Sequence, residues 1–191
     1  MFRTIRFQSL FSDQKLPFWE MLGVTNQYGM FLYLMPAKFG EVTFPLLVKS
    51  NLGVDLSYST GVLIAARVFD FLAISIILPI ALIPYWNTVP PGMRLASVFF
   101  SALVYIMFLF FIWSIRHQDI IRFRYLNREY RSKIISGIQK FLAGAYQGLQ
   151  IVQRRQLYWK IFILTLGIWF FINFNLYLIT LSLGYQISLY Q

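Results

Sequence analysis

Residues 95–115 read LASVFFSALVYIMFLFFIWSI, a run of twenty-one residues that contains no charge. A helix needs about 20 predominantly apolar residues to cross the hydrocarbon core of a bilayer, and this run has that length. Two further long and mostly apolar stretches lie on either side of it, at residues 58–84 and 161–185. The sequence therefore predicts an all-α polytopic membrane protein with three firm transmembrane helices.

The composition of the whole chain also favours a membrane protein. Of its 191 residues, 58% are hydrophobic and only 13% are charged. Soluble proteins average about 25% charged residues, so this balance excludes an ordinary soluble domain. The large apolar content excludes a disordered chain. The chain contains no cysteine, which also excludes a secreted module held together by disulfides.

The basic residues are concentrated in one segment. The chain carries 17 Lys and Arg against 7 Asp and Glu, a net charge of +10, and ten of the 17 lie within residues 116–160. Basic loops are retained on the cytoplasmic side of a bilayer and attract anionic lipid headgroups. We therefore expect this segment to be cytoplasmic, and we expect no nucleic acid as a partner. With the segment inside, the three spans run outward, inward and outward in turn.

The basic segment is longer than a simple connection. From Lys133 to Val152 its apolar residues recur at helical spacing, which predicts an amphipathic helix. We expect this helix to lie along the inner membrane surface. Packing against another cytoplasmic part of the protein would produce the same pattern.

Residues 1–57 form a cytoplasmic start followed by a stretch that enters the membrane. Leu16–Met35 is apolar but interrupted by polar residues, and Val42–Val48 is too short to cross. Pro36 and Gly40 lie between them, where they would break a helix. Basic residues flank the stretch on both sides, so we expect a re-entrant helical hairpin that enters and leaves by the same face. An ordinary pair of spans is the alternative.

Charged side chains at membrane depth are costly and usually mark a functional site. Lys38 and Glu41 lie three residues apart at the expected hairpin tip, and Arg67 and Asp70 lie three apart on the first span. We expect the two cations to bind a lipid phosphate and the two carboxylates to hold them in place. Alternatively, Arg67 and Asp70 are an internal ion pair that neutralises itself.

These residues form a pattern that is similar to a known family. The pattern is Pro-x-Lys-x-Gly-Glu, then a Gly about twelve residues later, then Arg-x-x-Asp at the start of a hydrophobic span. It resembles the signature of the lysylphosphatidylglycerol synthase transmembrane region, or flippase-like, family. The matching residues are Pro36, Lys38, Gly40, Glu41, Gly53, Arg67 and Asp70.

The resemblance implies an integral membrane protein of flippase-like type. Such a protein would bind and translocate a phospholipid or polyprenyl-phosphate lipid through a polar cavity at the re-entrant segment. Lys38 stands where the family has Arg, and Ala66 stands where a Glu is common. Family members also have further spans, so we expect residues 1–191 to form a single membrane domain that is the central part of a larger one. The resemblance and the basic loop together favour the plasma (inner) membrane of a prokaryote.

Two other functions remain open from the sequence. One is the membrane part of a lipid aminoacyl- or glycosyltransferase, in which Glu41 or Asp70 could act as a general base. The sequence contains no metal-binding or phosphate-loop motif, so we expect no catalytic residue, no metal and no cofactor. The other is a non-catalytic subunit that joins a second membrane chain or a second copy of itself. Asn173 and Asn175 could form hydrogen bonds across such helices.

Overall fold

The computed structural model of the chain describes residues 1–36, 39–116 and 157–183. All regular secondary structure in these residues is helical, and three stretches are long and apolar enough to span a membrane: Leu56–Tyr85, Pro91–Leu109 and Tyr158–Ser182. This confirms the predicted all-α membrane protein with three spans. The helices are α1 (Phe2–Leu10), α2 (Phe18–Leu34), α3 (Gly40–Leu52), α4 (Leu56–Leu82), the 3-10 turn η2 (Ile83–Tyr85), α5 (Pro91–Arg116) and α8 (Tyr158–Ser182).

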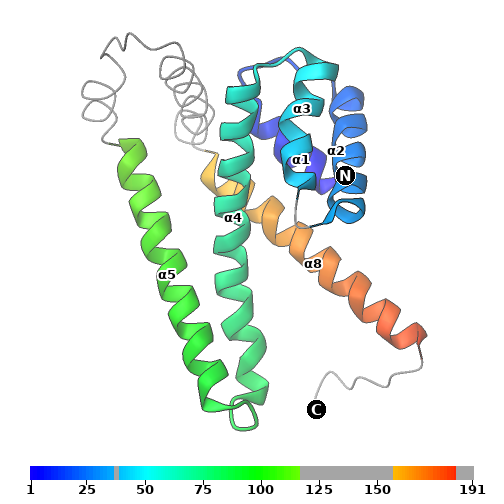
Figure 1. Ribbon diagram of the computed structural model, residues 1–191. Helices are drawn as coiled ribbons and strands as arrows, with labels where there is room; N and C mark the ends of the chain where they lie inside the picture. Colours follow the sequence, from blue (N-terminus) through cyan, green and yellow to red (C-terminus); the bar gives the residue numbers. More distant parts are fainter. Residues whose placement is uncertain (37–38, 117–156, 184–191) are drawn as a thin grey trace.

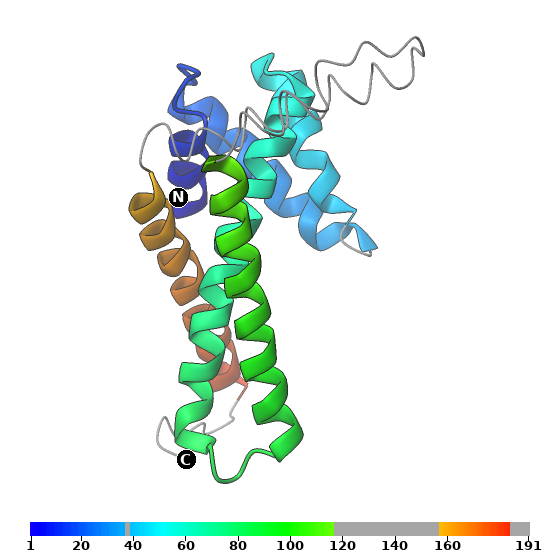
Figure 2. The ribbon, with the colours of Figure 1, turned by 90° about the vertical axis from the view of Figure 1, so that its left-hand side faces the viewer.

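The two long helices α4 and α5 run side by side as an antiparallel pair (Figures 1 and 2). Pro79 lies inside α4, and because proline has no N–H it leaves the carbonyl of Ser75 without its usual helical donor. The hydroxyl of Ser101 on α5 donates to that carbonyl at 2.9 Å. A neighbouring helix thus satisfies a backbone group that water cannot reach, as a membrane interior requires.

Helices α2 and α3 pack against each other as a helical hairpin beside the upper half of α4 (Figure 1). The helix break falls between Leu34 and Gly40, in the segment where the sequence predicts it. Gly40 is required by close packing, because a Cβ there would lie 2.5 Å from the backbone oxygen of Phe31 on α2. Entry of this hairpin into the membrane stays a prediction.

A tight turn connects α3 to α4. Gly53 ends α3 with φ of 67°, in the left-handed region that glycine adopts without steric cost. Asp55 then caps α4, and its carboxylate accepts hydrogen bonds from the backbone N–H groups of Ser57 and Tyr58. The left-handed glycine and the aspartate cap together set the direction in which α4 leaves the hairpin.

The N-terminal helix α1 lies inside the bundle, in contact with α2, α4 and α8 (Figure 1). Phe7, Leu10 and Phe11 project from one side of it and are at most 1% exposed. They join a core cluster to which α2, α3, α4 and α8 all contribute. Gly167 on α8 allows a close approach, because a Cβ there would lie 3.3 Å from the ring of Phe2. The start of the chain is therefore part of the core.

Two of the expectations fall on segments that the structure does not describe. The interfacial helix expected between Lys133 and Val152 lies outside the described residues, as does Lys38. The helix α4 begins at Leu56, two residues before the start of the expected span at residue 58.

Candidate functional site

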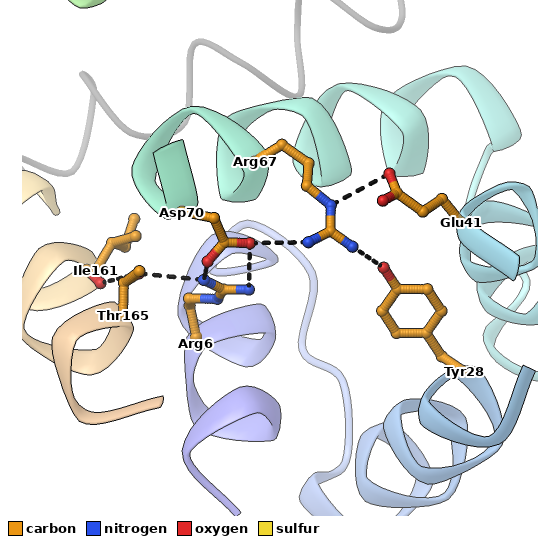
Figure 3. A network of polar contacts seen from close by, with 7 residues as sticks. All are labelled: Arg6, Tyr28, Glu41, Arg67, Asp70, Ile161 and Thr165. Carbon is orange, nitrogen blue, oxygen red and sulfur yellow. Dashed lines mark hydrogen bonds and ion pairs between the residues drawn. The ribbon is translucent and has the colours of Figure 1, made fainter. Parts of the chain in front are cut away.

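Arg67 is the centre of a group of polar side chains (Figure 3). Its Nη1 donates to Oδ2 of Asp70 at 3.0 Å, one helical turn further along α4. Its Nη2 donates to the hydroxyl of Tyr28 on α2 at 2.5 Å. Its Nε lies 3.2 Å from Oε2 of Glu41 on α3, an ion pair without the geometry of a hydrogen bond. One guanidinium therefore connects three helices.

Asp70 is shared by two arginines. Besides Arg67, it accepts hydrogen bonds from both terminal nitrogens of Arg6 on α1, with Nη1 of Arg6 2.5 Å from Oδ1. The side chains of Arg6 and Asp70 are 4% and 10% exposed. A buried charge is tolerated when it is paired and hydrogen bonded, and this pair meets both conditions.

Arg6 also reaches α8. Its Nη1 donates to the hydroxyl of Thr165 at 3.1 Å, and that hydroxyl in turn donates to the carbonyl of Ile161 (Figure 3). Together these contacts link α1, α2, α3, α4 and α8. We call this set the polar cluster, which consists of Arg6, Tyr28, Glu41, Arg67, Asp70 and Thr165.

The secondary structure explains why these side chains meet. Glu41 lies in the first turn of α3, where a carboxylate is favoured by the helix dipole, and this places it at the tip of the hairpin. Arg67 lies eleven residues into α4, which at 1.5 Å per residue is about 16 Å along the helix. The hairpin tip therefore reaches the middle of α4. The i, i+3 spacing places Asp70 on the same face of α4 as Arg67.

A cavity of about 140 Å³ adjoins the polar cluster. Its lining combines arginine side chains from α1 and α4 with apolar side chains from α2 and α8. The described lining residues carry three positive charges and one negative charge, so this surface is suited to an anion. The lining residues are Arg3, Arg6, Tyr28, Leu32, Arg67, Asp70, Ile168, Trp169 and Ile172.

The structure brings together three of the four charged residues that the sequence singled out. Glu41 and Asp70 both contact Arg67, as expected for carboxylates that hold a cation in place. Lys38 lies outside the described residues. Among the motif residues, Gly40 permits the close packing of α2 on α3 and Gly53 ends α3.

Sequence reasoning missed Arg6 and Tyr28. Arg6 is one of the basic residues that precede the hairpin in the sequence, yet it is only 3% exposed. One signal could have found it, because Arg6 and the apolar Leu10 lie four residues apart and so share a helix face. A cation on the apolar face of a helix needs a buried partner, and Asp70 is that partner.

Pro36 stands at the helix break itself. Its carbonyl accepts a hydrogen bond from the backbone N–H of Phe39, which closes the turn at the tip. In the part of the chain that the structure describes, no group of three or more His, Cys, Asp or Glu side chains could hold a metal ion. The polar cluster offers guanidinium, carboxylate and hydroxyl groups, and the indole of Trp169 lines the adjoining cavity.

Comparison with known proteins places this geometry in a family. No curated protein and no solved structure matches the chain significantly. The family model of the lysylphosphatidylglycerol synthase TM region, in contrast, matches residues 1–191. The chain therefore belongs to the lysylphosphatidylglycerol synthase TM region family of membrane proteins.

Proposed function

We propose that the protein binds and translocates a phospholipid or a polyprenyl-phosphate lipid, with the lipid headgroup held at the polar cluster. The observation that carries the proposal is the cavity of about 140 Å³ lined by Arg3, Arg6 and Arg67 in a helical membrane protein. Arginines at membrane depth are costly, and a phosphate is the group that their planar fork binds best. Membership of a lipid-related membrane family supports the same conclusion.

The hairpin α2–α3 provides the polar path in this proposal. We propose that it enters the membrane from the cytoplasmic side and carries Glu41 to the middle of the bilayer. Its contact with Arg67, about 16 Å along α4, corresponds to half of a hydrocarbon core about 30 Å thick. Irregular backbone at that depth is tolerated where protein or a water-filled cavity surrounds it, and among the described helices α2 and α4 pack against α3.

A flipping assay tests the proposal. The full chain is reconstituted into vesicles that contain a fluorescent phospholipid, and dithionite added outside reports how fast inner-leaflet lipid reaches the outer leaflet. We expect Arg67→Met to slow lipid movement about tenfold or more, because a hydrogen bond to a charged group is lost. Lys49→Met is the matched control, since Lys49 is exposed at the end of α3. Equal rates for the two variants would show that Arg67 does not bind the headgroup.

We further propose that the protein lies in a prokaryotic plasma membrane with residues 116–160 in the cytoplasm. The chain contains no cysteine, so single cysteines can be introduced directly. A membrane-impermeant maleimide applied to intact cells is expected to label Asn87→Cys, in the turn between α4 and α5. It is expected to leave Ser136→Cys unlabelled until the cells are broken. The opposite labelling pattern would reverse the topology.

A further inference from the structure

Three N–H donors on residues that line the cavity have no hydrogen-bond acceptor among the described residues, and one of them, Nε of Arg67, still has Glu41 as an ion-pair partner. Nε of Arg6 and the indole nitrogen Nε1 of Trp169 are buried, and neither has a hydrogen-bond partner among the residues that the structure describes. Both residues line the cavity beside the polar cluster. Buried N–H groups in proteins are nearly always hydrogen bonded. Two unpaired donors on one cavity therefore indicate that an acceptor occupies it in the working protein.

The remaining donors of Arg6 are already engaged. Its two terminal nitrogens donate to Asp70, and one of them also donates to Thr165. Only Nε is left, and the side chain that carries it is 4% exposed. The polar cluster therefore fixes this guanidinium beside the cavity and leaves one of its N–H groups without an acceptor.

The charges at the cavity determine the kind of acceptor. Arg3 comes from the first turn of α1, and its guanidinium passes close to Gly29 of α2. With Arg6 and Arg67 it gives three positive charges against the single carboxylate of Asp70 among the described lining residues. An acceptor with several oxygens and a negative charge suits this surface, and a phosphate is such a group.

Part of the cavity lining is apolar. Leu32 of α2 and Ile168 and Ile172 of α8 form this part. Ile172 is 39% exposed, so the apolar lining continues to the exterior of the bundle. A cavity of about 140 Å³ is comparable to one that holds a benzene ring, which leaves room for a phosphate and a few further atoms. A phosphate esterified to an apolar group suits both the arginines and the apolar side chains of this lining.

We propose that Arg6 and Trp169, together with Arg3, form a phosphodiester subsite that receives the headgroup phosphate of a membrane lipid, whose apolar part leaves the cavity past Leu32 and Ile172. This inference rests on the proposed lipid-binding function and names the ligand class and the donors for it. Trp169 contributes a hydrogen bond without a charge, and it does so from α8, a helix outside the Pro-x-Lys-x-Gly-Glu and Arg-x-x-Asp motifs.

The test measures binding of dihexanoyl phosphatidylglycerol to the full chain in a neutral maltoside detergent. Trp169→Phe keeps an aromatic ring and removes only the N–H, and we expect it to raise Kd about tenfold. Trp159→Phe is the matched control on the same helix, because Trp159 is 75% exposed. It is expected to change Kd less than about twofold.

Binding of two further compounds shows whether the site recognises a lipid phosphate, a free phosphate or the lipid tails alone. Inorganic phosphate that binds as tightly as the short-chain lipid would overturn the lipid assignment and leave a simple anion site. Dihexanoylglycerol, which has no phosphate, would overturn the phosphodiester assignment if it bound equally well. The subsite is also wrong if Trp169→Phe and Trp159→Phe bind the lipid alike.

The subsite and the proposed function can fail separately. If lipid movement in vesicles depends on Arg67 while Trp169→Phe binds lipid normally, the subsite is wrong and the proposed function stands. If wild-type protein moves no lipid but its affinity for dihexanoyl phosphatidylglycerol depends on Trp169, translocation is wrong and the subsite stands. Slowed movement by Trp169→Phe, together with weakened binding, supports both.

Discussion

Replacing Asp70 by asparagine tests whether this carboxylate is the shared counter-ion of two arginines. Asn has nearly the same size and shape, so the packing around it is retained and the negative charge is removed. Arg6 and Asp70 are buried, with side chains 4% and 10% exposed. The substitution therefore leaves the guanidinium of Arg6 in the core without a compensating charge.

The expected loss of unfolding free energy follows from the burial of the Arg6–Asp70 pair. Removal of one partner from a buried ion pair destabilises a protein by about 3–5 kcal/mol. Arg67 adds less, because it is 31% exposed and keeps Glu41 and Tyr28, and a partly exposed pair contributes at most about 1 kcal/mol. We therefore expect Asp70→Asn to lower the free energy of unfolding by about 3–5 kcal/mol.

The measurement is chemical unfolding of the purified chain in detergent micelles. Glu20→Gln is the control, since Glu20 is exposed in the first turn of α2 and its loss is expected to cost at most about 1 kcal/mol. A double-mutant cycle with Arg6→Met isolates the pair, and we expect a coupling energy of at least about 1 kcal/mol. A loss within 1 kcal/mol of the control, or no coupling, would refute the role of Asp70 as a shared counter-ion.

Three further substitutions test the packing of the bundle by the same unfolding measurement. Ser101→Ala removes the hydroxyl that donates to the Ser75 carbonyl, and we expect a loss of about 1 kcal/mol. Gly40→Ala places a Cβ 2.5 Å from the Phe31 oxygen, which forces α2 and α3 apart and should cost about 1–3 kcal/mol. Gly53→Ala requires a side chain at φ of 67° and should cost about 1–2 kcal/mol.

Each of these substitutions has a control within the chain. Ser101→Ala should cost less in a Pro79→Ala background, because alanine restores the backbone N–H that the Ser75 carbonyl lacks. Gly23→Ala should stabilise α2 by about 0.5–1 kcal/mol, since a Cβ there meets nothing within 4 Å. Gly53→Asn should be milder than Gly53→Ala, because asparagine tolerates the left-handed region. If a control lowered the unfolding free energy more than the substitution it is paired with, the packing argument for that site would be contradicted.

The sequence predicted the features that depend on composition along one helix. Residues 95–115 and the other two runs are long enough to cross a membrane whatever they pack against, so their length and apolar composition were sufficient to predict the spans. Arg67 and Asp70 stood out because a charge is rare inside such a run. Glu41 was identified by its place in the Pro-x-Lys-x-Gly-Glu motif.

The features that depend on tertiary contacts could not be predicted in this way. Arg6 lies in a helix of mixed polar and apolar residues, and only the packing of α1 against α4 and α8 shows that its side chain is buried. Tyr28 and Thr165 contribute hydroxyl groups whose role appears only when α2 and α8 are placed beside α4 and α1. Trp169 looks like one more aromatic residue of a span, and only its position at the cavity distinguishes it.

The partners of Arg6 are synthesised long after Arg6 itself. Its partners Asp70 and Thr165 lie 64 and 159 residues later in the chain. At about 5–20 residues per second, Thr165 is synthesised roughly 10–30 s after Arg6. Before α8 is made, Asp70 already has a partner within its own helix, because Arg67 pairs with it at i, i+3 spacing. The contact between Arg6 and Thr165, in contrast, can form only after α8 has been synthesised.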